Sequence, residues 1–299
     1  MKPRTDLVVV SGSGCTRLAM ELSRHLAATF KPLVTREFPD GELYVRVPQE
    51  VRGKRVALAI CSGRRPNDAL IEAVLAVKTL TRVGAREVIL IMPYFPYARQ
   101  DQEFSPGEAV SLSIVAELLE VLGISALVTV DMHLHRVKSI GEVFRIKAIN
   151  VSGMGELARY VSKNYGEGFT VVAPDEEARQ WAEIFSKEIG ADYLVLEKER
   201  KGDEDVRIRG EVSNVKKAVI VDDIISTGTT VAAAALTLRE YGVEEIIAAC
   251  THGLFVAGAE AKIVSAGVKD IVATDSVVNQ FARVSVAVPI ANALVDITA

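Results

Sequence analysis

Short runs of apolar, often β-branched residues alternate along the chain with longer segments in which apolar residues recur every three or four positions. The short runs predict strands buried on both faces, and the longer segments predict helices that cover a sheet. In the first half the predicted strands are Leu7–Val10, Val56–Cys61, Val88–Met92 and Ala126–Val130, with helices at 16–28, 67–83 and 109–122. This order is typical of βαβ units around a mainly parallel sheet.

The second half of the chain repeats this order. Its predicted strands are Thr170–Ala173, Tyr193–Leu196, Ala218–Val221, Ile246–Cys250 and Asp270–Ala273, with helices at 176–189, 230–241 and 257–266. Each half also carries a polar turn between β-rich segments, at 33–47 and at 193–212. Since 299 residues are roughly twice a typical domain of about 100–150 residues, we predict an α/β protein with two related domains, 1–149 and 150–299.

Composition narrows the possible partners. A net charge of −4 gives no basic field for nucleic acid, and no stretch approaches the ~20 apolar residues of a membrane span. The three cysteines, Cys15, Cys61 and Cys250, lack metal or redox spacing, so we expect reduced core thiols. The sequence therefore predicts a soluble cytoplasmic protein with neither nucleic acid nor membrane as partner.

The segment KKAVIVDDIISTGTT at 216–230 is the strongest candidate for chemistry. A buried strand ends at its aspartates and a helix begins near Thr229, a position where open α/β sheets bind ligands. Three features of this segment together favour a bound phosphate: its hydroxyl groups, a glycine that lets the backbone approach a ligand closely, and the N-terminus of a helix. The residues that would hold it are Ser226, Thr227, Gly228, Thr229 and Thr230. The loop has no lysine at the position that a nucleotide P-loop requires.

The acidic pair Asp222 and Asp223 has a different task, because carboxylates repel a phosphate. They suit sugar hydroxyls or a bound Mg²⁺. The segment thus predicts a site for a phosphorylated sugar. An alternative is that the aspartates cap a turn and the hydroxyls merely start the helix.

VIVDDIISTGTT resembles the phosphoribosyl-diphosphate motif shared by type I phosphoribosyltransferases and the ribose-phosphate pyrophosphokinase family. Further segments resemble the second family, in its order: FPDGE (38–42), RRPNDALIEAVL (64–75), PYFPYARQD (93–101), DMHLHR (131–136) and THGLF (251–255). Ser226, where many bacterial members have an aspartate, makes the chain more similar to the archaeal type. The resemblance implies two type I phosphoribosyltransferase-like domains, with ATP bound mainly by the first.

FPDGE offers the aromatic ring of Phe38 and the acceptors Asp40 and Glu42, although alone it reads as a β-turn built on Asp-Gly. The resemblance implies that this loop contacts the adenine of ATP in a neighbouring subunit, and hence that the protein is a homo-oligomer. It likewise implies that Arg99, Gln100 and Asp101 bind ATP.

Asp131, His133 and His135 stand at alternate positions after a predicted strand, so in an extended chain they share one face. The resemblance implies that Asp131 and His133 serve the ATP-bound Mg²⁺ and phosphates. It implies that Asp175 contacts the ribose and metal region, beside an unusual pair, Glu176 and Glu177, whose charge Arg179 could offset.

Lys198 and Arg200 begin a charged stretch that, on composition, is a surface turn. The resemblance implies that they are the catalytic pair, which stabilises charge on the transferred phosphates.

As a whole, the resemblance implies that the β,γ-diphosphoryl group of MgATP passes to the 1-hydroxyl of D-ribose 5-phosphate. The products are 5-phospho-α-D-ribose 1-diphosphate (PRPP) and AMP. Two alternatives are a phosphoribosyltransferase, which consumes PRPP, and a non-catalytic regulatory homologue.

Overall fold

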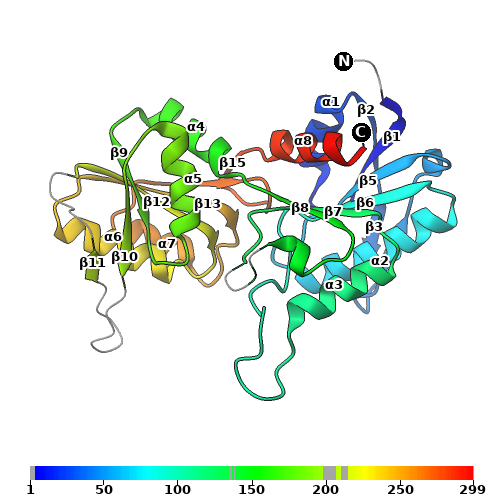
Figure 1. The fold of residues 1–299 in the computed structure, drawn as a ribbon, viewed down its shortest axis with the longest axis horizontal. Coiled ribbons are helices and arrows are strands. Elements are labelled where there is room, and N and C mark those ends of the chain that lie inside the picture. Colours follow the sequence, from blue (N-terminus) through cyan, green and yellow to red (C-terminus); the bar gives the residue numbers. More distant parts are fainter. Residues whose placement is uncertain (1–3, 135–136, 138, 198–206, 210–214, 299) are drawn as a thin grey trace. The chain divides into compact units, whose positions relative to one another are not determined.

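The computed structural model describes residues 4–134, 137, 139–197, 207–209 and 215–298. The chain forms two compact units (Figure 1). The first contains Met1–Ser152, Ser276–Val278 and Val286–Ala299, and the second contains Gly153–Asp275 and Asn279–Ser285. Lys198, Arg200 and His135, all singled out from the sequence, lie outside the described residues.

The first unit is built on a parallel sheet with the strand order β2-β1-β5-β6-β7-β8. The strands are β1 (Arg4–Ser11), β2 (Ala28–Pro32), β5 (Arg55–Ala59), β6 (Glu87–Ile91), β7 (Ala126–Val130) and β8 (Lys147–Val151). An antiparallel hairpin, β3 (Val34–Glu37) and β4 (Leu43–Arg46), stands apart from this sheet. Two short 3₁₀ helices are at Gln49–Val51 and Ile140–Glu142.

Helices cover both faces of this sheet because alternate strand residues project to opposite sides. The helices are α1 (Thr16–His25), α2 (Pro66–Arg82), α3 (Ser111–Val121) and α8 (Ala287–Thr298). One core contains α2 and α3, and the opposite core contains α1 and α8. The predicted helix at 16–28 ends earlier than expected, because Ala28 already begins the edge strand β2.

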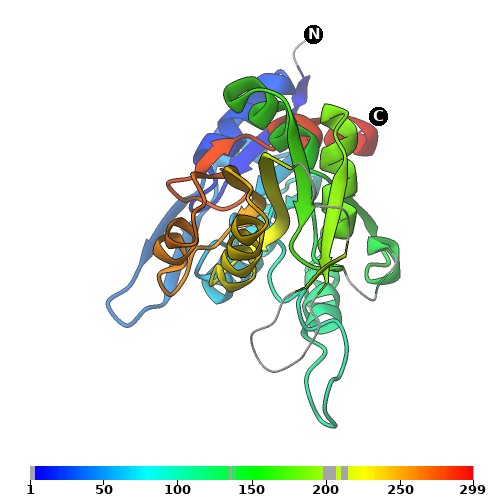
Figure 2. The same cartoon turned by 90° about the vertical axis from the view of Figure 1, so that its left-hand side faces the viewer.

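The second unit has the strand order β11-β10-β9-β12-β13-β14-β15, parallel except for β11. The strands are β9 (Phe169–Ala173), β10 (Tyr193–Glu197), β11 (Arg207–Arg209), β12 (Lys217–Ile225), β13 (Glu245–Gly253), β14 (Asp270–Thr274) and β15 (Ala282–Val284). Helices α4 (Met154–Tyr165) and α5 (Arg179–Ile189) cover one face. Helices α6 (Thr229–Glu240) and α7 (Ala259–Ser265) lie side by side on the other (Figure 2).

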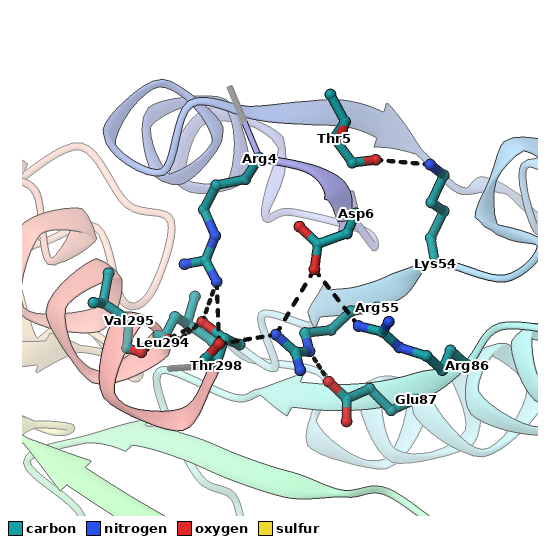
Figure 3. Close-up of polar contacts among 10 residues, drawn as sticks. All are labelled: Arg4, Thr5, Asp6, Lys54, Arg55, Arg86, Glu87, Leu294, Val295 and Thr298. Atoms are coloured by element: carbon teal, nitrogen blue, oxygen red, sulfur yellow. Dashed lines mark hydrogen bonds and ion pairs between the residues drawn. The ribbon is translucent and has the colours of Figure 1, made fainter. Parts of the chain in front are cut away.

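The end of the chain, Val286–Ala299, returns to the first unit. The predicted range 150–299 for the second domain is therefore wrong for these last residues. Ile290 and Leu294 of α8 are fully buried in the core that contains α1. Arg4 donates to the Thr298 hydroxyl at 2.6 Å, and Arg55 donates to the Thr298 carbonyl at 3.1 Å (Figure 3). The sequence marks α8 as apolar but does not say which core it joins.

Two of the three cysteines form a disulfide, so the expectation of three reduced thiols is wrong for Cys15 and Cys61. The two residues are 46 positions apart, and their Cα atoms lie 5.2 Å apart. They meet because β1 and β5 are neighbours, so that the loops after them leave the same edge of the sheet. Cys250 is buried and free, as expected.

None of the helices within the described ranges is long and apolar enough to cross a membrane.

Candidate active site

The predicted phosphate loop joins β12 to α6. Gly228 caps the helix with a φ of 70°, in the left-handed region that favours glycine. A Cβ atom there would lie 2.9 Å from the Ile263 side chain and 3.0 Å from the Ala259 carbonyl, so only glycine fits without displacement. The hydroxyls of Thr227 and Thr229 are 3.2 Å apart. Hydroxyls and free helix N–H groups thus gather at one end of α6, as a bound phosphate requires.

Three carboxylates gather beside this loop. Strand β12 runs through Asp222 and Asp223 and ends only at Ile225, later than predicted. Strands β9 and β12 are neighbours, and Asp175 follows β9 at the same edge of the sheet. Burial raises the pKa of Asp222 well above its ordinary value, and the charges of Asp223 and Asp175 raise it further. The Oδ1 atom of Asp222 accepts the Asp223 N–H at 2.9 Å, which fixes this side chain.

This cluster suits a cation on chemical grounds. Carboxylate oxygens are the ligands that Mg²⁺ prefers, and a divalent cation would relieve the mutual repulsion that raises the pKa of Asp222. Across the described ranges, no group of three or more His, Cys, Asp or Glu side chains is arranged as a complete metal site. Mg²⁺ is commonly bound by one or two carboxylates together with phosphate oxygens of a substrate, so Mg²⁺ at this cluster would need further ligands from a substrate.

The pair Glu176 and Glu177 follows Asp175, whose Oδ1 accepts the Ala178 N–H at 3.2 Å. Arg179 donates two hydrogen bonds to Glu176, at 2.6 and 2.8 Å, and thereby lowers the pKa of that carboxyl. Arg179 therefore offsets the charge of Glu176, as the sequence suggested.

The structure adds a residue that the sequence reasoning missed. Lys262, on α7, donates to the Thr229 hydroxyl at 2.8 Å. It is 33 positions from Thr229, and no spacing motif connects the two.

In the first unit, FPDGE forms the tip of the β3–β4 hairpin. The Phe38 N–H bonds the Glu42 carbonyl at 2.8 Å, and Asp40 accepts the Glu42 N–H at 3.2 Å, so Asp40 shapes the turn. The guanidinium of Arg36 lies 4.5 Å from the centre of the Phe38 ring and 4.7 Å from that of Tyr44. These cation–π contacts orient Phe38, which stays 36% exposed and available to a base.

The hairpin is held to the first unit by the alternate residues of β3. Thr35 and Ser13 share a hydrogen bond of 3.0 Å between their hydroxyls, and Glu37 pairs with Arg65 at 2.9 Å. Arg36, between them, projects to the other face of the hairpin, where it pairs with Tyr44. These two contacts anchor the hairpin, and so Phe38 at its tip is held in place relative to the first unit.

The other predicted ATP residues follow β6 and β7, which are neighbours in the sheet. Arg99 is exposed, Gln100 and Asp101 are half-buried, and the Gln100 amide donates to Glu108 at 3.1 Å. His133 is half-buried, and Asp131 is buried with a φ of 36°. The backbone is thus not extended at Asp131, so the prediction of alternate side chains on one face is wrong there. The shared sheet edge still brings these loops to the same end of the unit.

The fold and the phosphate loop define the class: two domains of the type I phosphoribosyltransferase kind, as predicted. Residues 7–123 match the family model of the N-terminal domain of ribose phosphate pyrophosphokinase, and residues 141–288 match that of the phosphoribosyl transferase domain.

The chain is 38% identical to ribose-phosphate pyrophosphokinase from Methanopyrus kandleri, over 98% of this chain and 100% of that protein. It is 36% identical to ribose-phosphate pyrophosphokinase 1 from Archaeoglobus fulgidus, over 86% of this chain and 89% of that protein. The crystal structure of phosphoribosylpyrophosphate synthetase from Mycobacterium smegmatis superposes with a TM-score of 0.84, at 27% identity, covering 98% of this chain and 99% of that one. The chain belongs to the ribose-phosphate pyrophosphokinase family.

Proposed function

We propose that the protein transfers the β,γ-diphosphoryl group of ATP to the 1-hydroxyl of D-ribose 5-phosphate, which yields PRPP and AMP. The observation that carries this proposal is the sugar-phosphate loop of the second unit in a chain that matches the family over nearly its whole length. ATP and ribose 5-phosphate are cytoplasmic metabolites, so we place the reaction in the cytoplasm.

Ribose 5-phosphate is proposed to bind between the loop and the acidic pair. The 5-phosphate accepts hydrogen bonds from the hydroxyls and N–H groups of 226–230, where the α6 dipole favours an anion. Asp222 and Asp223 accept hydrogen bonds from the sugar hydroxyls. The 1-hydroxyl is then held in a single orientation for attack, and such positioning is a large part of catalysis in phosphoryl transfer.

ATP is proposed to bind the first unit. Phe38 of a neighbouring subunit stacks on the adenine, and Asp40 and Glu42 of that subunit accept hydrogen bonds from the adenine amino group. Arg99, Gln100, Asp101 and His133 bind the phosphates, so Gln100 exchanges its contact with Glu108 for one with ATP. Asp131 and His133 would hold the Mg²⁺ that accompanies ATP, and Asp175 would hold Mg²⁺ beside the ribose. Mg²⁺ neutralises phosphate charge when bound.

Formation of AMP tests this proposal. Purified protein with ATP, Mg²⁺ and ribose 5-phosphate is expected to release AMP and PRPP with no nucleobase present, and the release should stop when EDTA removes Mg²⁺. A phosphoribosyltransferase would need a nucleobase, and a regulatory homologue would release no AMP under any of these conditions.

We also propose that the protein self-associates through an exposed apolar surface on two adjacent helices, called the α2/α3 face. Its residues are Ile71, Leu75, Ile114, Leu118 and Val121, with Val121 77% exposed. The helices are adjacent, since Lys78 of α2 donates to the Val121 carbonyl at 3.2 Å. Several large apolar side chains exposed on adjacent helices favour an interaction site.

A second copy of the chain suits the α2/α3 face by charge. Exposed Lys78 and Arg82 lie on α2, and exposed Glu117 lies on α3. A two-fold axis would set α2 of one copy against α3 of the other and so bring opposite charges together.

Val121→Glu is therefore expected to convert an oligomer into a monomer, as measured by size-exclusion chromatography with light scattering. The rate of AMP formation should fall in the monomeric variant, because the Phe38 hairpin is proposed to contact ATP bound to a neighbouring subunit. Leu236→Glu, at a residue of α6 that is 54% exposed, is the matched control and should change neither. A wild-type protein that is monomeric and fully active contradicts this proposal.

A further inference from the structure

Lys262 of α7 lies beside the loop that joins β12 to α6. Its ammonium group donates to the Thr229 hydroxyl at 2.8 Å, and that hydroxyl lies 3.2 Å from the hydroxyl of Thr227. The two threonines belong to the loop to which we assign the 5-phosphate. An ammonium group has three N–H donors, so one contact with Thr229 leaves donors for a further acceptor.

The position of Lys262 is fixed relative to the loop by backbone contacts. The N–H groups of Leu254 and Phe255 bond the Ile225 carbonyl at 2.9 and 3.1 Å, and the Val256 N–H bonds the Ser226 carbonyl at 2.9 Å. Helix α7 follows this segment directly. The close approach of Gly228 to Ile263, the neighbour of Lys262, locks α7 against the loop. Lys262 therefore reaches the loop from a rigid support.

A bound phosphate would bring negative charge to a loop that has no positively charged side chain of its own, and Lys262 could balance that charge. The other loop donors are neutral hydroxyls and N–H groups, and a phosphate dianion placed there would face the nearby carboxylates of Asp222 and Asp223. Several other lysines of this unit are already paired with acids: Lys216 with Glu244, and Lys217 and Lys269 with Glu245. Within the described residues, Lys262 contacts no carboxylate, and the acid nearest in sequence, Glu260, accepts from Gln280 at 2.7 Å.

We infer that Lys262 binds the 5-phosphate of ribose 5-phosphate, supplying the cation that the loop itself lacks. This inference rests on the proposed function for the identity of the ligand. A lysine carried by a separate helix thereby does at this site what a lysine within the loop does in nucleotide P-loops.

The test is the Lys262→Met variant, which keeps most of the aliphatic stem but removes the charge. A charge-assisted hydrogen bond of this kind predicts that the KM for ribose 5-phosphate rises about tenfold, while kcat and the KM for ATP stay unchanged. Calorimetric titration with ribose 5-phosphate alone should show the same loss. Lys262→Arg should restore binding, and Lys269→Ala, an exposed lysine of the same unit, should have no effect.

A second variant separates direct contact with phosphate from an effect through Thr229. If Lys262 only orients the Thr229 hydroxyl, adding Lys262→Met to Thr229→Val causes no further loss. If it contacts the phosphate, affinity falls again in the Thr229→Val background, and salt weakens binding to the lysine-containing protein more than to the methionine variant. Unchanged affinity in Lys262→Met overturns the inference while AMP formation continues. Absence of AMP formation by the wild type contradicts the proposed function, and the calorimetric titration still decides the role of Lys262.

Discussion

Asp222→Asn is expected to raise the unfolding temperature of the ligand-free protein at pH 7 and to lower its rate of AMP formation by about a hundredfold. The gain in stability comes from removing a charge that burial and two neighbouring carboxylates, Asp223 and Asp175, make unfavourable. The Asn side chain keeps an Oδ1 atom, so it can still accept the Asp223 N–H. The loss of activity comes from a charged acceptor for the sugar hydroxyls, since hydrogen bonds to charged groups stabilise by about 1.5–3 kcal/mol each.

The raised pKa of Asp222 also predicts how the unfolding free energy changes with pH. Because the pKa of Asp222 is raised in the folded protein, the folded state binds this proton more tightly than the unfolded state. The unfolding free energy therefore falls as pH rises from the ordinary carboxyl pKa to the raised value, and it stays at the lower level above it. Asn cannot titrate, so its advantage grows as pH rises above the ordinary carboxyl pKa and disappears below about pH 4.

The measurement is thermal unfolding of both proteins without Mg²⁺ at pH 4 and pH 7, together with the AMP assay. Asp192→Asn, at an exposed carboxylate of the same unit, is the control and should change neither quantity. Mg²⁺ with ribose 5-phosphate should stabilise the wild type more than Asp222→Asn. An unfolding temperature that drops at pH 7 would show that the three carboxylates do not repel one another as the pKa shift requires.

Much of the fold was predictable because its signals are local. A strand buried on both faces must be a continuous apolar run, and Val88–Met92 and Ala126–Val130 correspond closely to β6 and β7. The loop between β12 and α6 was also predictable, because strand, aspartates, glycine and helix start follow one another within 216–230. The conformation of such a segment is set by its own residues and depends little on where the strand lies in the sheet.

Features that depend on long-range contacts were not predictable. The edge strand β2 forms only because β1 lies beside it, and α8 joins the first core by a return of the chain that no local pattern reports. The disulfide and the contact between Lys262 and Thr229 likewise join residues that are adjacent only after folding.

The candidate site was predictable to a different degree in each unit. In the second, the residues of the loop supply their own argument for binding a phosphate. In the first, Phe38, Arg99 and Asp131 gain a role chiefly from the family resemblance, and the structure adds the contacts that orient Phe38. The left-handed backbone at Asp131 could not be foreseen, because the regular alternation of an extended chain is the default after a strand.

Lys198→Ala is expected to lower kcat by about a hundred- to a thousandfold, the usual cost of removing one donor that faces developing transition-state charge. Lys198 follows β10 directly and lies outside the described residues, so its role rests on the chemistry of the reaction and on the family. As the bond from the β-phosphorus to AMP breaks, negative charge grows on oxygens that carried less of it in ATP. A cation aimed at those oxygens stabilises the transition state more than the bound substrates.

Steady-state kinetics with each substrate varied separately is the measurement. The KM values for ATP and ribose 5-phosphate should change little, in contrast to Lys262→Met, because a ground-state contact changes KM and a transition-state contact changes kcat. Lys187→Ala, at an exposed lysine of α5 in the same unit, is the control for the loss of one positive charge. If Lys198→Ala raises only a KM, this lysine binds substrate and another group must carry the transition-state charge. If neither constant changes, the catalytic assignment of Lys198 is wrong, although AMP formation by the wild type would still support the proposed reaction.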